Sequence, residues 1–427
     1  MHTVTIVADD LTGVLDAGHS FAERGHETVV IATPADMISR SRPRSRAVSR
    51  PRSGAVIGYN TDSRYRSPSE AADRVSEAVT ALPAATTYKK VDSTLRGNVG
   101  IEIDAALRSA GAAVAVFAPA YPEQGRTTRD GTHYVDDEPI DATTYAADAK
   151  GPDTALLTDL FADLGRPVTH LSLDHVREGR VHVRAELQAI AAGADEPPIV
   201  AVDATKPSHL ATVAAAIRPL NALPAGSAGL AKHLRLSEDA TEAVSVTPPD
   251  ESGPLGIVGS VNPETFAQLR RVPSEAVFTL EPAALVSETV PRETVARVAD
   301  RIRSGEPAVI TAATDEKAVE RTVKAGERRG LVASRVRDRV AMTLGMTGLA
   351  VIEAGAVSGL LVTGGDVALA TLRHADGTGI SLTGTSIAEG MPVGRVMDGS
   401  LAETLLVTKA GGFGERNALR DYFEWGG

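Results

Sequence analysis

The chain has 427 residues, a formal net charge of −11 and no cysteine. Its length is more than one hydrophobic core usually serves, which predicts two domains. The acidic balance argues against an electrostatic nucleic-acid binder, and the lack of cysteine excludes disulfides, thiolate zinc sites and a cysteine nucleophile. No apolar run approaches the ~18 residues of a membrane span, and no charged segment followed by an apolar one opens the sequence. We therefore expect a cytoplasmic enzyme or binding protein with no membrane or nucleic-acid partner.

Short β-branched runs alternate with helix-like stretches through the first half of the chain. Two of these stretches, Pro68–Ala81 and Val99–Ala110, carry apolar residues at helical spacing. The alternation predicts βαβ units around a mostly parallel sheet. The predicted strands are Thr3–Ala8, Thr28–Ala32, Ala55–Tyr59, Thr87–Val91, Ala113–Ala118 and Pro198–Val202.

Two adjacent carboxylates, Asp9 and Asp10, follow the first predicted strand and precede the turn Leu11-Thr12-Gly13. Ligands of open α/β sheets bind at the carboxyl ends of the strands. Neighbouring carboxylates can coordinate a metal or hydrogen-bond to a polyhydroxylated ligand. Capping of the next helix by one carboxylate, with the other in solvent, explains the pair equally well.

Charged and hydroxyl side chains also follow the later strands. Asn60–Arg64 comes directly after one strand, and Lys89–Asn98 places lysine, aspartate, hydroxyls and arginine in one strand-to-helix junction. Backbone N–H groups and cations at such a junction suit an anionic ligand. A structural turn needs only a cap and a glycine, so the junction favours a binding site. The proline-containing segment Ala118–Thr128, with Arg126, is predicted to be a turn that could line a polar pocket.

The middle of the chain contains two segments unlike the rest. Residues 40–52 alternate arginine with serine and proline, which predicts a mobile surface loop, although a basic tract can also hold a polyanion. The stretch Ser237–Gly253 contains Pro248-Pro249 and no sustained periodicity, which is typical of a linker. We therefore predict domains at residues 1–236 and 254–427.

Glycine-containing loops follow three predicted strands of the second half. They are Gly259-Ser260, Thr363–Asp366 and Lys409–Gly414. Glycine lets backbone N–H groups approach phosphate oxygens, so the three loops together predict a nucleotide pocket without a P-loop. The predicted strands here are Leu255–Val258, Ala276–Leu280, Ala308–Thr311, Gly359–Val362 and Leu405–Thr408, with helices at Arg292–Ser304 and Ser334–Ala354. The whole chain is expected to be α/β, with two lobes that each contain a mostly parallel sheet flanked by helices, and an interdomain cleft.

These motifs resemble the four-carbon acid sugar kinase family. Asp9–Gly13 with Asp16, and Lys89–Asn98, resemble the family's substrate-binding domain, and the Lys-x-Asp-Ser-Thr-Leu-Arg-Gly-Asn run is the most specific match. Pro119–Thr127 and Gly226–Ala231 look like the blocks that follow, and the three glycine loops are similar to the family's nucleotide-binding loops. The chain departs from the family's Gly-Gly-Glu-Thr loop, since it has Gly364-Gly365-Asp366-Val367 there.

The resemblance implies phosphorylation of a hydroxyl of a four-carbon acid sugar, such as an erythronate, a threonate or an oxo-tetronate, with ATP and Mg²⁺ as cofactors. The expected substrate-binding residues are Asp9, Asp10, Arg64, Lys90, Asp92, Ser93, Thr94 and Arg96. The expected ATP-binding residues are Ser260, Gly364, Gly365, Asp366, Gly411 and Gly412. The catalytic proton acceptor is Asp10 or Asp92, which the sequence does not separate. Mg²⁺ is expected to be held largely by water and the nucleotide, so no protein ligand is assigned to it.

Two alternatives remain open from the sequence. One is a kinase for a branched or oxidised sugar acid such as oxo-isoapionate. The other is a non-catalytic sensor of the same fold that binds a sugar acid or a nucleotide without transfer. The expected partners are small molecules, a sugar acid and ATP, and the sequence leaves open whether the chain forms a homo-oligomer.

Overall fold

The computed structural model of the chain describes residues 3–33, 55–236, 243–248 and 252–425. These residues form two compact units, which are described separately below. The N-terminal unit contains residues 3–30 and 55–236, and the C-terminal unit contains residues 31–33 and the described residues from 243 onward. The arginine-rich tract 40–52 lies outside the described residues and the linker 237–253 lies partly outside them, so the domain boundary stays a prediction. None of the described helices is long and apolar enough to cross a membrane.

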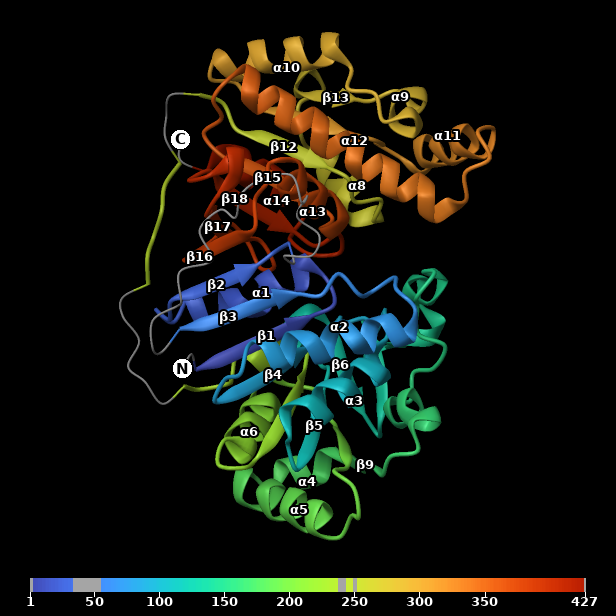
Figure 1. The fold of residues 1–427 in the computed structure, drawn as a ribbon, viewed down its shortest axis with the longest axis vertical. Helices are drawn as coiled ribbons and strands as arrows, with labels where there is room; N and C mark the ends of the chain where they lie inside the picture. Colours follow the sequence, from blue (N-terminus) through green and yellow to red (C-terminus); the bar gives the residue numbers. More distant parts are fainter. Residues whose placement is uncertain (1–2, 34–54, 237–242, 249–251, 426–427) are drawn as a thin grey trace. The chain divides into compact units, whose positions relative to one another are not determined.

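The N-terminal unit is built on a sheet whose strands run in the order β2-β3-β1-β4-β11-β5-β10-β9 (Figure 1). The pairs that join β3 through β9 in this order are all parallel. The strands are β1 (Val4–Ala8), β2 (Thr28–Ile31), β3 (Val56–Asn60), β4 (Thr86–Lys90), β5 (Val114–Ala118), β9 (Val168–Leu171), β10 (Ile199–Val202) and β11 (Ala222–Gly226). The helices are α1 (Leu11–Ala22), α2 (Pro68–Ala81), α3 (Val99–Ala110), α4 (Leu173–Arg177), α5 (Arg180–Ala192), α6 (Pro207–Ile217) and α7 (Ala228–Ala231).

Local sequence explains where these elements begin and end. Strands β1 and β5 are apolar except for Thr5 of β1 and are buried at every residue, as in parallel strands covered on both faces. Helix α2 begins with the Ser67 cap and Pro68 in its first turn, and helix α3 ends at Gly111, whose φ of 61° lies in the left-handed region. The helices predicted at Pro68–Ala81 and Val99–Ala110 are therefore confirmed, and the predicted strands agree to within one residue at each end.

The register of the sheet brings three loops together. Ala8, the last residue of β1, lies opposite Asn60 of β3 on one side and Lys90 of β4 on the other. The three central strands therefore end at the same level, and the residues that follow them meet at one edge of the sheet.

A small antiparallel sheet of β6 (Arg126–Arg129), β7 (Thr132–Val135) and β8 (Glu138–Pro139) follows β5. Its first hairpin turns through Asp130 and Gly131, with φ of 50° and 72°. Positive φ at both central residues is the pattern of a two-residue hairpin turn that favours Asp-Gly. The chain then forms short 3-10 helices, of which the longest is Leu157–Leu164, before it returns to β9.

The C-terminal unit contains a second sheet, with the order β13-β14-β12-β15-β18-β17-β16. The first five strands are mutually parallel, and β17 is antiparallel to both of its neighbours. The strands are β12 (Leu255–Val258), β13 (Val277–Thr279), β14 (Ala308–Thr311), β15 (Leu360–Thr363), β16 (Gly379–Ser386), β17 (Pro392–Val396) and β18 (Leu405–Lys409). The helices are α8 (Pro263–Leu269), α9 (Pro282–Ser287), α10 (Arg292–Arg303), α11 (Glu316–Glu327), α12 (Ala333–Ala354), α13 (Gly365–His374) and α14 (Ala418–Glu424).

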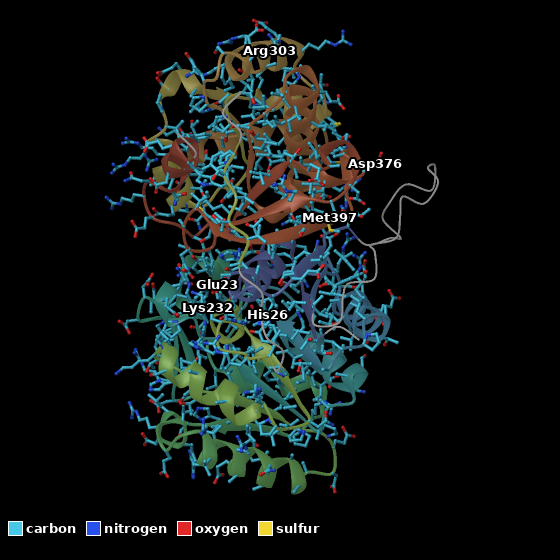
Figure 2. The ribbon with its side chains drawn as sticks, turned by 90° about the vertical axis from the view of Figure 1, so that its left-hand side faces the viewer. Glu23, His26, Lys232, Arg303, Asp376 and Met397 are labelled. Atoms are coloured by element: carbon cyan, nitrogen blue, oxygen red, sulfur yellow. The ribbon has the colours of Figure 1, made fainter. Side chains whose placement is uncertain are left out.

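Helix α12 is the longest described helix and packs against α10 and α13 (Figure 1). The outer end of α10 is polar: Arg303 is exposed and forms an ion pair with Asp300 on the surface (Figure 2). Register again aligns three strand ends, because Thr363 of β15 lies opposite Val258 of β12 and Lys409 of β18. Both units are therefore α/β with a mostly parallel sheet flanked by helices, as predicted.

Candidate active site

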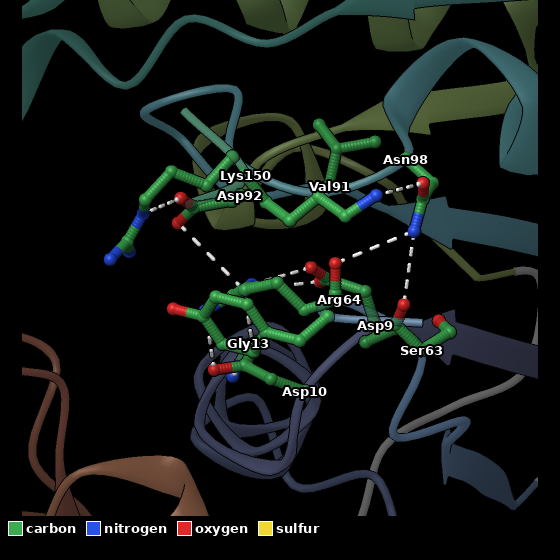
Figure 3. Close-up of polar contacts among 12 residues, drawn as sticks. Asp9, Asp10, Gly13, Ser63, Arg64, Val91, Asp92, Asn98 and Lys150 are labelled. Atoms are coloured by element: carbon green, nitrogen blue, oxygen red, sulfur yellow. Dashed lines mark hydrogen bonds and ion pairs between the residues drawn. The ribbon is translucent and has the colours of Figure 1, made fainter. Parts of the chain in front are cut away.

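A buried arginine binds two carboxylates where β1 and β3 end (Figure 3). Arg64 donates from Nε to Asp9 Oδ2 at 2.6 Å and from Nη2 to Asp9 Oδ1 at 3.2 Å. Its Nη1 donates to Asp10 Oδ2 at 2.9 Å, and Nη2 lies 2.9 Å from Asp10 Oδ1. The guanidinium thus makes a two-point contact with each carboxylate, which fixes both in orientation.

Asp10 is also the N-cap of α1. Its Oδ1 accepts the Gly13 N–H at 2.9 Å and its Oδ2 accepts the Thr12 hydroxyl at 2.6 Å. The capping role considered from the sequence is therefore confirmed for Asp10, and the same side chain also binds Arg64. Since its oxygens already accept three hydrogen bonds and form a further ion-pair contact with Arg64, the Asp10 carboxylate has little capacity left for a ligand proton.

A second network lies in the loop after β4. Asp92 Oδ2 accepts the Thr94 hydroxyl and the Arg96 Nε–H, both at 2.6 Å. Asp92 Oδ1 lies 4.0 Å from Arg64 Nη2, which links this loop to the first network (Figure 3). The Ser93 side chain is buried, and its hydroxyl has no hydrogen-bond partner among the residues that the structure describes.

The charges of this cluster are balanced internally. Burial alone would raise the pKa of Asp10, but Arg64, Lys90 and the Thr12 hydroxyl together hold it below its usual value. Burial opposes ionisation of Asp92 as well, yet Arg96 and Arg64 hold its pKa far below the normal range. Both carboxylates are therefore ionised at neutral pH, and the pKa of Arg64 is raised by Asp10 and Asp9 against the effect of burial.

Lys90 lies beside Asp10. A Cβ placed on Gly13 would be 2.6 Å from Asp10 Oδ1 and 3.2 Å from Lys90 Nζ, so both side chains lie against Gly13. The Lys90 ammonium is buried and donates to the Val91 carbonyl at 2.7 Å. It forms no ion pair with a described carboxylate within 4.0 Å, so two of its three N–H donors remain for a ligand. Its neighbour Lys89 instead forms a buried ion pair with Glu102 at 2.9 Å.

Two buried polar side chains, Asn98 and His133, hydrogen-bond to the backbone of these loops and hold them in place. Asn98 Nδ2 donates to the carbonyls of Ser63 and Arg64 (Figure 3). His133 of β7 contacts the Ser93 carbonyl through Nε2 at 2.9 Å and the Thr128 hydroxyl through Nδ1 at 3.0 Å. Because a carbonyl can only accept, Nε2 carries the proton and the Thr128 hydroxyl donates to Nδ1. Burial lowers the pKa of His133 to about 4, which keeps the ring neutral.

The glycine loops of the C-terminal unit also meet. Thr363 Oγ1 accepts the N–H groups of Gly259 and Ser260, each at 3.2 Å. The Gly364 N–H donates to the Lys409 carbonyl at 3.2 Å. A Cβ on Gly411 would be 2.4 Å from Ser260 Oγ, so only glycine fits there without a shift. The carboxyl ends of β12, β15 and β18 thus carry one continuous set of loops.

These loops leave backbone donors available. Helix α13 begins at Gly365 after Gly364, whose φ of 91° favours glycine, and no side chain caps this end. Its first-turn N–H groups suit an anion. Asp366 in the same turn is half-exposed and lies 3.5 Å from Arg337 of α12. Gly412 lies in the half-buried loop between β18 and α14.

The structure therefore brings the predicted residues into two groups. Within the N-terminal unit all eight expected substrate-binding residues lie in or beside the Asp9–Arg64–Asp92 cluster. Sequence reasoning left out His133, and it named Lys409 only as the first residue of the loop Lys409–Gly414, not among the expected ATP-binding residues. A histidine in a hairpin gave no signal, whereas a lysine at the end of the apolar strand Leu405–Lys409 could have been recognised as a buried cation. Among the described residues, no group of three His, Asp or Glu side chains could hold a metal ion.

Two family models match different parts of the chain. Residues 4–234 match the family model of a sugar-binding N-terminal domain, and residues 255–419 match that of a nucleotide-binding C-terminal domain. A crystal structure from Salmonella typhimurium covers 99% of both chains with a TM-score of 0.76 at 19% identity, which shows the fold alone.

Curated relatives match over nearly the full length. A D-threonate kinase of Salmonella typhimurium is 30% identical over 97% of this chain and 96% of its own. A D-erythronate kinase of Heliobacterium modesticaldum is 30% identical over 98% and 95%, and a 3-oxo-tetronate kinase of Methylobacterium radiotolerans is 30% identical over 96% and 95%. With both family models matched and this coverage, the chain belongs to the four-carbon acid sugar kinase family.

Proposed function

We propose that the protein is an ATP-dependent kinase that phosphorylates a hydroxyl of a four-carbon acid sugar, namely a threonate, an erythronate or an oxo-tetronate. One observation carries the proposal. A charge-balanced cluster of carboxylates and cations lies at the strand ends of the unit that matches a sugar-binding domain. Relatives with this domain pair are kinases of such acids.

The substrate carboxylate requires a cation with free donors, and this selects Lys90 and Arg96 in our proposal. Arg64 uses most of its N–H groups on Asp9 and Asp10, whereas Arg96 uses only its Nε–H, on Asp92 and Thr94, and its Nη1 and Nη2 have no hydrogen-bond partner among the described residues. Lys90 retains two donors beside Asp10. The Ser93 hydroxyl is free to orient a substrate hydroxyl, and the remaining expected residues fix the shape of the pocket.

The proton acceptor in our proposal is Asp92. The Asp10 oxygens accept three hydrogen bonds and form a further ion-pair contact with Arg64, whereas Asp92 Oδ1 has only Arg64 at 4.0 Å. Phosphoryl transfer through a loose transition state demands positioning more than a strong base, so an ionised carboxylate of low pKa can accept the hydroxyl proton late in the step. Asp10 then orients the acceptor rather than deprotonating it.

The nucleotide phosphates would bind against the loops of Ser260, Gly364, Gly365, Asp366, Gly411 and Gly412, where backbone donors and the N-terminus of α13 converge. Mg²⁺ fits this arrangement as an ion that arrives on the nucleotide and neutralises phosphate charge, because no described carboxylate cluster could hold it alone. Transfer also requires water to be excluded around the acceptor, so we propose a closing motion during turnover.

ADP release with ATP and Mg²⁺ tests the proposal, measured over a panel of threonates, erythronates, 3-oxo-tetronates and oxo-isoapionate. We expect one acid to give a kcat/KM at least tenfold above the others. In parallel, calorimetry measures the binding of each acid and of a non-hydrolysable ATP analogue. Binding of both ligands without turnover on any acid would identify a sensor and overturn the kinase proposal.

A further inference from the structure

A buried ammonium lies beneath the last glycine loop of the C-terminal unit. Lys409 is the final residue of β18, and its side chain is fully buried. Its Nζ lies 3.1 Å from the Gly411 carbonyl, 3.2 Å from the Ala410 carbonyl and 3.4 Å from Thr265 Oγ1. All three partners are neutral, and no described carboxylate lies within ion-pair distance of this Nζ.

The charged groups on the surrounding elements do not pair with it. Glu264 of α8 is the carboxylate that acts on Lys409 electrostatically, and it is only half-buried. Asp366, which begins α13 beside this loop, pairs with Arg337, and Arg395 of β17 pairs with Glu403. Strand β15 contributes only apolar residues and Thr363. Burial therefore lowers the pKa of Lys409 to about 7, with Glu264 opposing part of the effect.

A buried cation without a counter-charge is costly unless a ligand supplies one. Hydrogen bonds connect the Lys409–Gly414 loop to the loop that contains Ser260. The Gly411 carbonyl accepts the Thr265 hydroxyl at 2.9 Å, and Thr265 Oγ1 in turn lies 3.1 Å from Ser260 Oγ. An anion held by these loops would lie close to the ammonium. No other described lysine occupies this set of loops.

We propose that Lys409 supplies the positive charge against which the nucleotide phosphates bind, and that nucleotide binding is coupled to the uptake of a proton by its amine. The inference rests on the proposed function of the C-terminal unit as the ATP site. Only the protonated amine attracts phosphate, so affinity should be constant below pH 7 and fall above it, at most tenfold per pH unit. Since most empty protein carries the neutral amine at pH 8, binding there should take up roughly 0.9 proton per nucleotide.

Calorimetry in two buffers of different ionisation enthalpy measures this proton directly, without catalysis. The ligand is the Mg²⁺ complex of a non-hydrolysable ATP analogue at pH 8, where its own phosphates no longer titrate. The wild type should show uptake of nearly one proton. Lys409→Met should show none, and should bind at least tenfold more weakly at pH 6.5.

Two further variants keep the test decisive. Lys409→Arg keeps its charge at all these pH values, so it should bind the analogue with no uptake and with one affinity from pH 6.5 to 9. Lys324→Met, which removes an exposed lysine of α11, should behave as the wild type. Trp425, the only tryptophan of the chain, reports whether the C-terminal unit of each variant is folded.

The outcomes separate the two proposals. Analogue binding by the wild type with no buffer-dependent proton, or full affinity and uptake in Lys409→Met, would overturn the role of Lys409 and leave the kinase proposal intact. Failure of the wild type to bind any adenine nucleotide from pH 6.5 to 8 would overturn both.

Discussion

Replacement of Arg64 by methionine tests whether the N-terminal cluster is held together by charge. The guanidinium contacts Asp9 and Asp10 at 2.6 to 3.2 Å and lies 4.0 Å from Asp92, with only a tenth of its side chain exposed. Arg64→Met keeps much of the apolar stem but leaves the buried carboxylates of Asp9 and Asp92 and the partly buried carboxylate of Asp10 without their shared cation. Loss of one partner from a buried pair costs about 3–5 kcal/mol. For a unit of this size the melting temperature should fall by roughly 10 °C.

The pH dependence of the loss gives the sharper test. In the wild type the lowered pKa values of Asp10 and Asp92 contribute stability that is present above their unfolded values near 3.8, and it disappears only as pH falls through the folded values. In Arg64→Met the burial effect on Asp10 is opposed only by Lys90 and the Thr12 hydroxyl, so we expect its pKa to rise above the unfolded value. Stability of the variant then falls as pH rises. The difference in melting temperature between variant and wild type should therefore be larger at pH 7.5 than at pH 5.

Far-UV circular dichroism follows the melting, and Trp425 fluorescence reports separately on the C-terminal unit, which should be unaffected. Arg108→Met is the matched control, because Arg108 also pairs with an aspartate at 2.9 Å but its side chain is 63% exposed. That variant should lose less than about 1 kcal/mol, independent of pH. A loss in Arg64→Met no larger than in Arg108→Met, or equal losses at pH 5 and pH 7.5, would refute the electrostatic account of the cluster.

Three further substitutions test the acceptor site. Asp92→Asn should lower kcat by about 10²–10⁴-fold while leaving the dissociation constant of the ATP analogue unchanged; lost nucleotide affinity would contradict the assignment of the two ligands to separate units. In Gly13→Ala the new Cβ would lie 2.6 Å from Asp10 Oδ1 and push this oxygen away, so kcat/KM for the acid should fall about tenfold or more. Gly193→Ala is the control: its Cβ would meet nothing closer than 3.4 Å, so kcat and KM should stay unchanged. His133→Phe should lower kcat/KM for the acid about tenfold, because the Ser93 carbonyl loses its donor. His133→Gln should recover most of this kcat/KM by restoring the hydrogen bonds with the Ser93 carbonyl and the Thr128 hydroxyl. Equal defects in the two variants would mean that ring packing alone matters. Since the folded pKa of His133 lies below the unfolded value of 6.5, the wild type should also lose stability as pH falls from 6.5 toward 4, and His133→Gln should not.

Sequence patterns predicted the elements that follow regular rules and missed those that break them. Strand β11 was not predicted, because Pro224 lies inside it and proline argues against a strand within a sheet. The strand pairing explains this exception. Strand β11 pairs with β4 only at Ala225 and Gly226, so Pro224 lies outside the β11–β4 pairing. The hairpin of β6 and β7 was also missed, although Asp130-Gly131 is a favoured hairpin turn.

The candidate site was predictable as a set of strand ends but not as a set of contacts. Each predicted cluster follows a strand, and parallel register then brings the clusters together. Which cation binds which carboxylate could not be predicted, because Asp9 and Arg64 are 55 residues apart and their pairing depends on side-chain geometry. The same geometry leaves Lys90 and Arg96, rather than Arg64, with donors available for a ligand.

Buried charges are neutralised within the N-terminal cluster but not at Lys409, and this difference should determine how the kinetic constants depend on pH. The acceptor cluster neutralises its charges internally, and the lowered pKa values of Asp10 and Asp92 keep both carboxylates ionised near neutral pH. Lys409 has no internal counter-charge, and its pKa of about 7 puts its titration within the working range of an enzyme. If both proposals hold, the alkaline decline in kcat/KM should therefore appear in the KM for ATP and leave the KM for the acid constant between pH 7 and 9. Lys409→Arg should abolish that decline, because the guanidinium keeps its charge across the whole interval. A rise in the KM for the acid over this interval would instead place the titrating group in the acceptor cluster, against the charge balance that the Arg64 contacts imply.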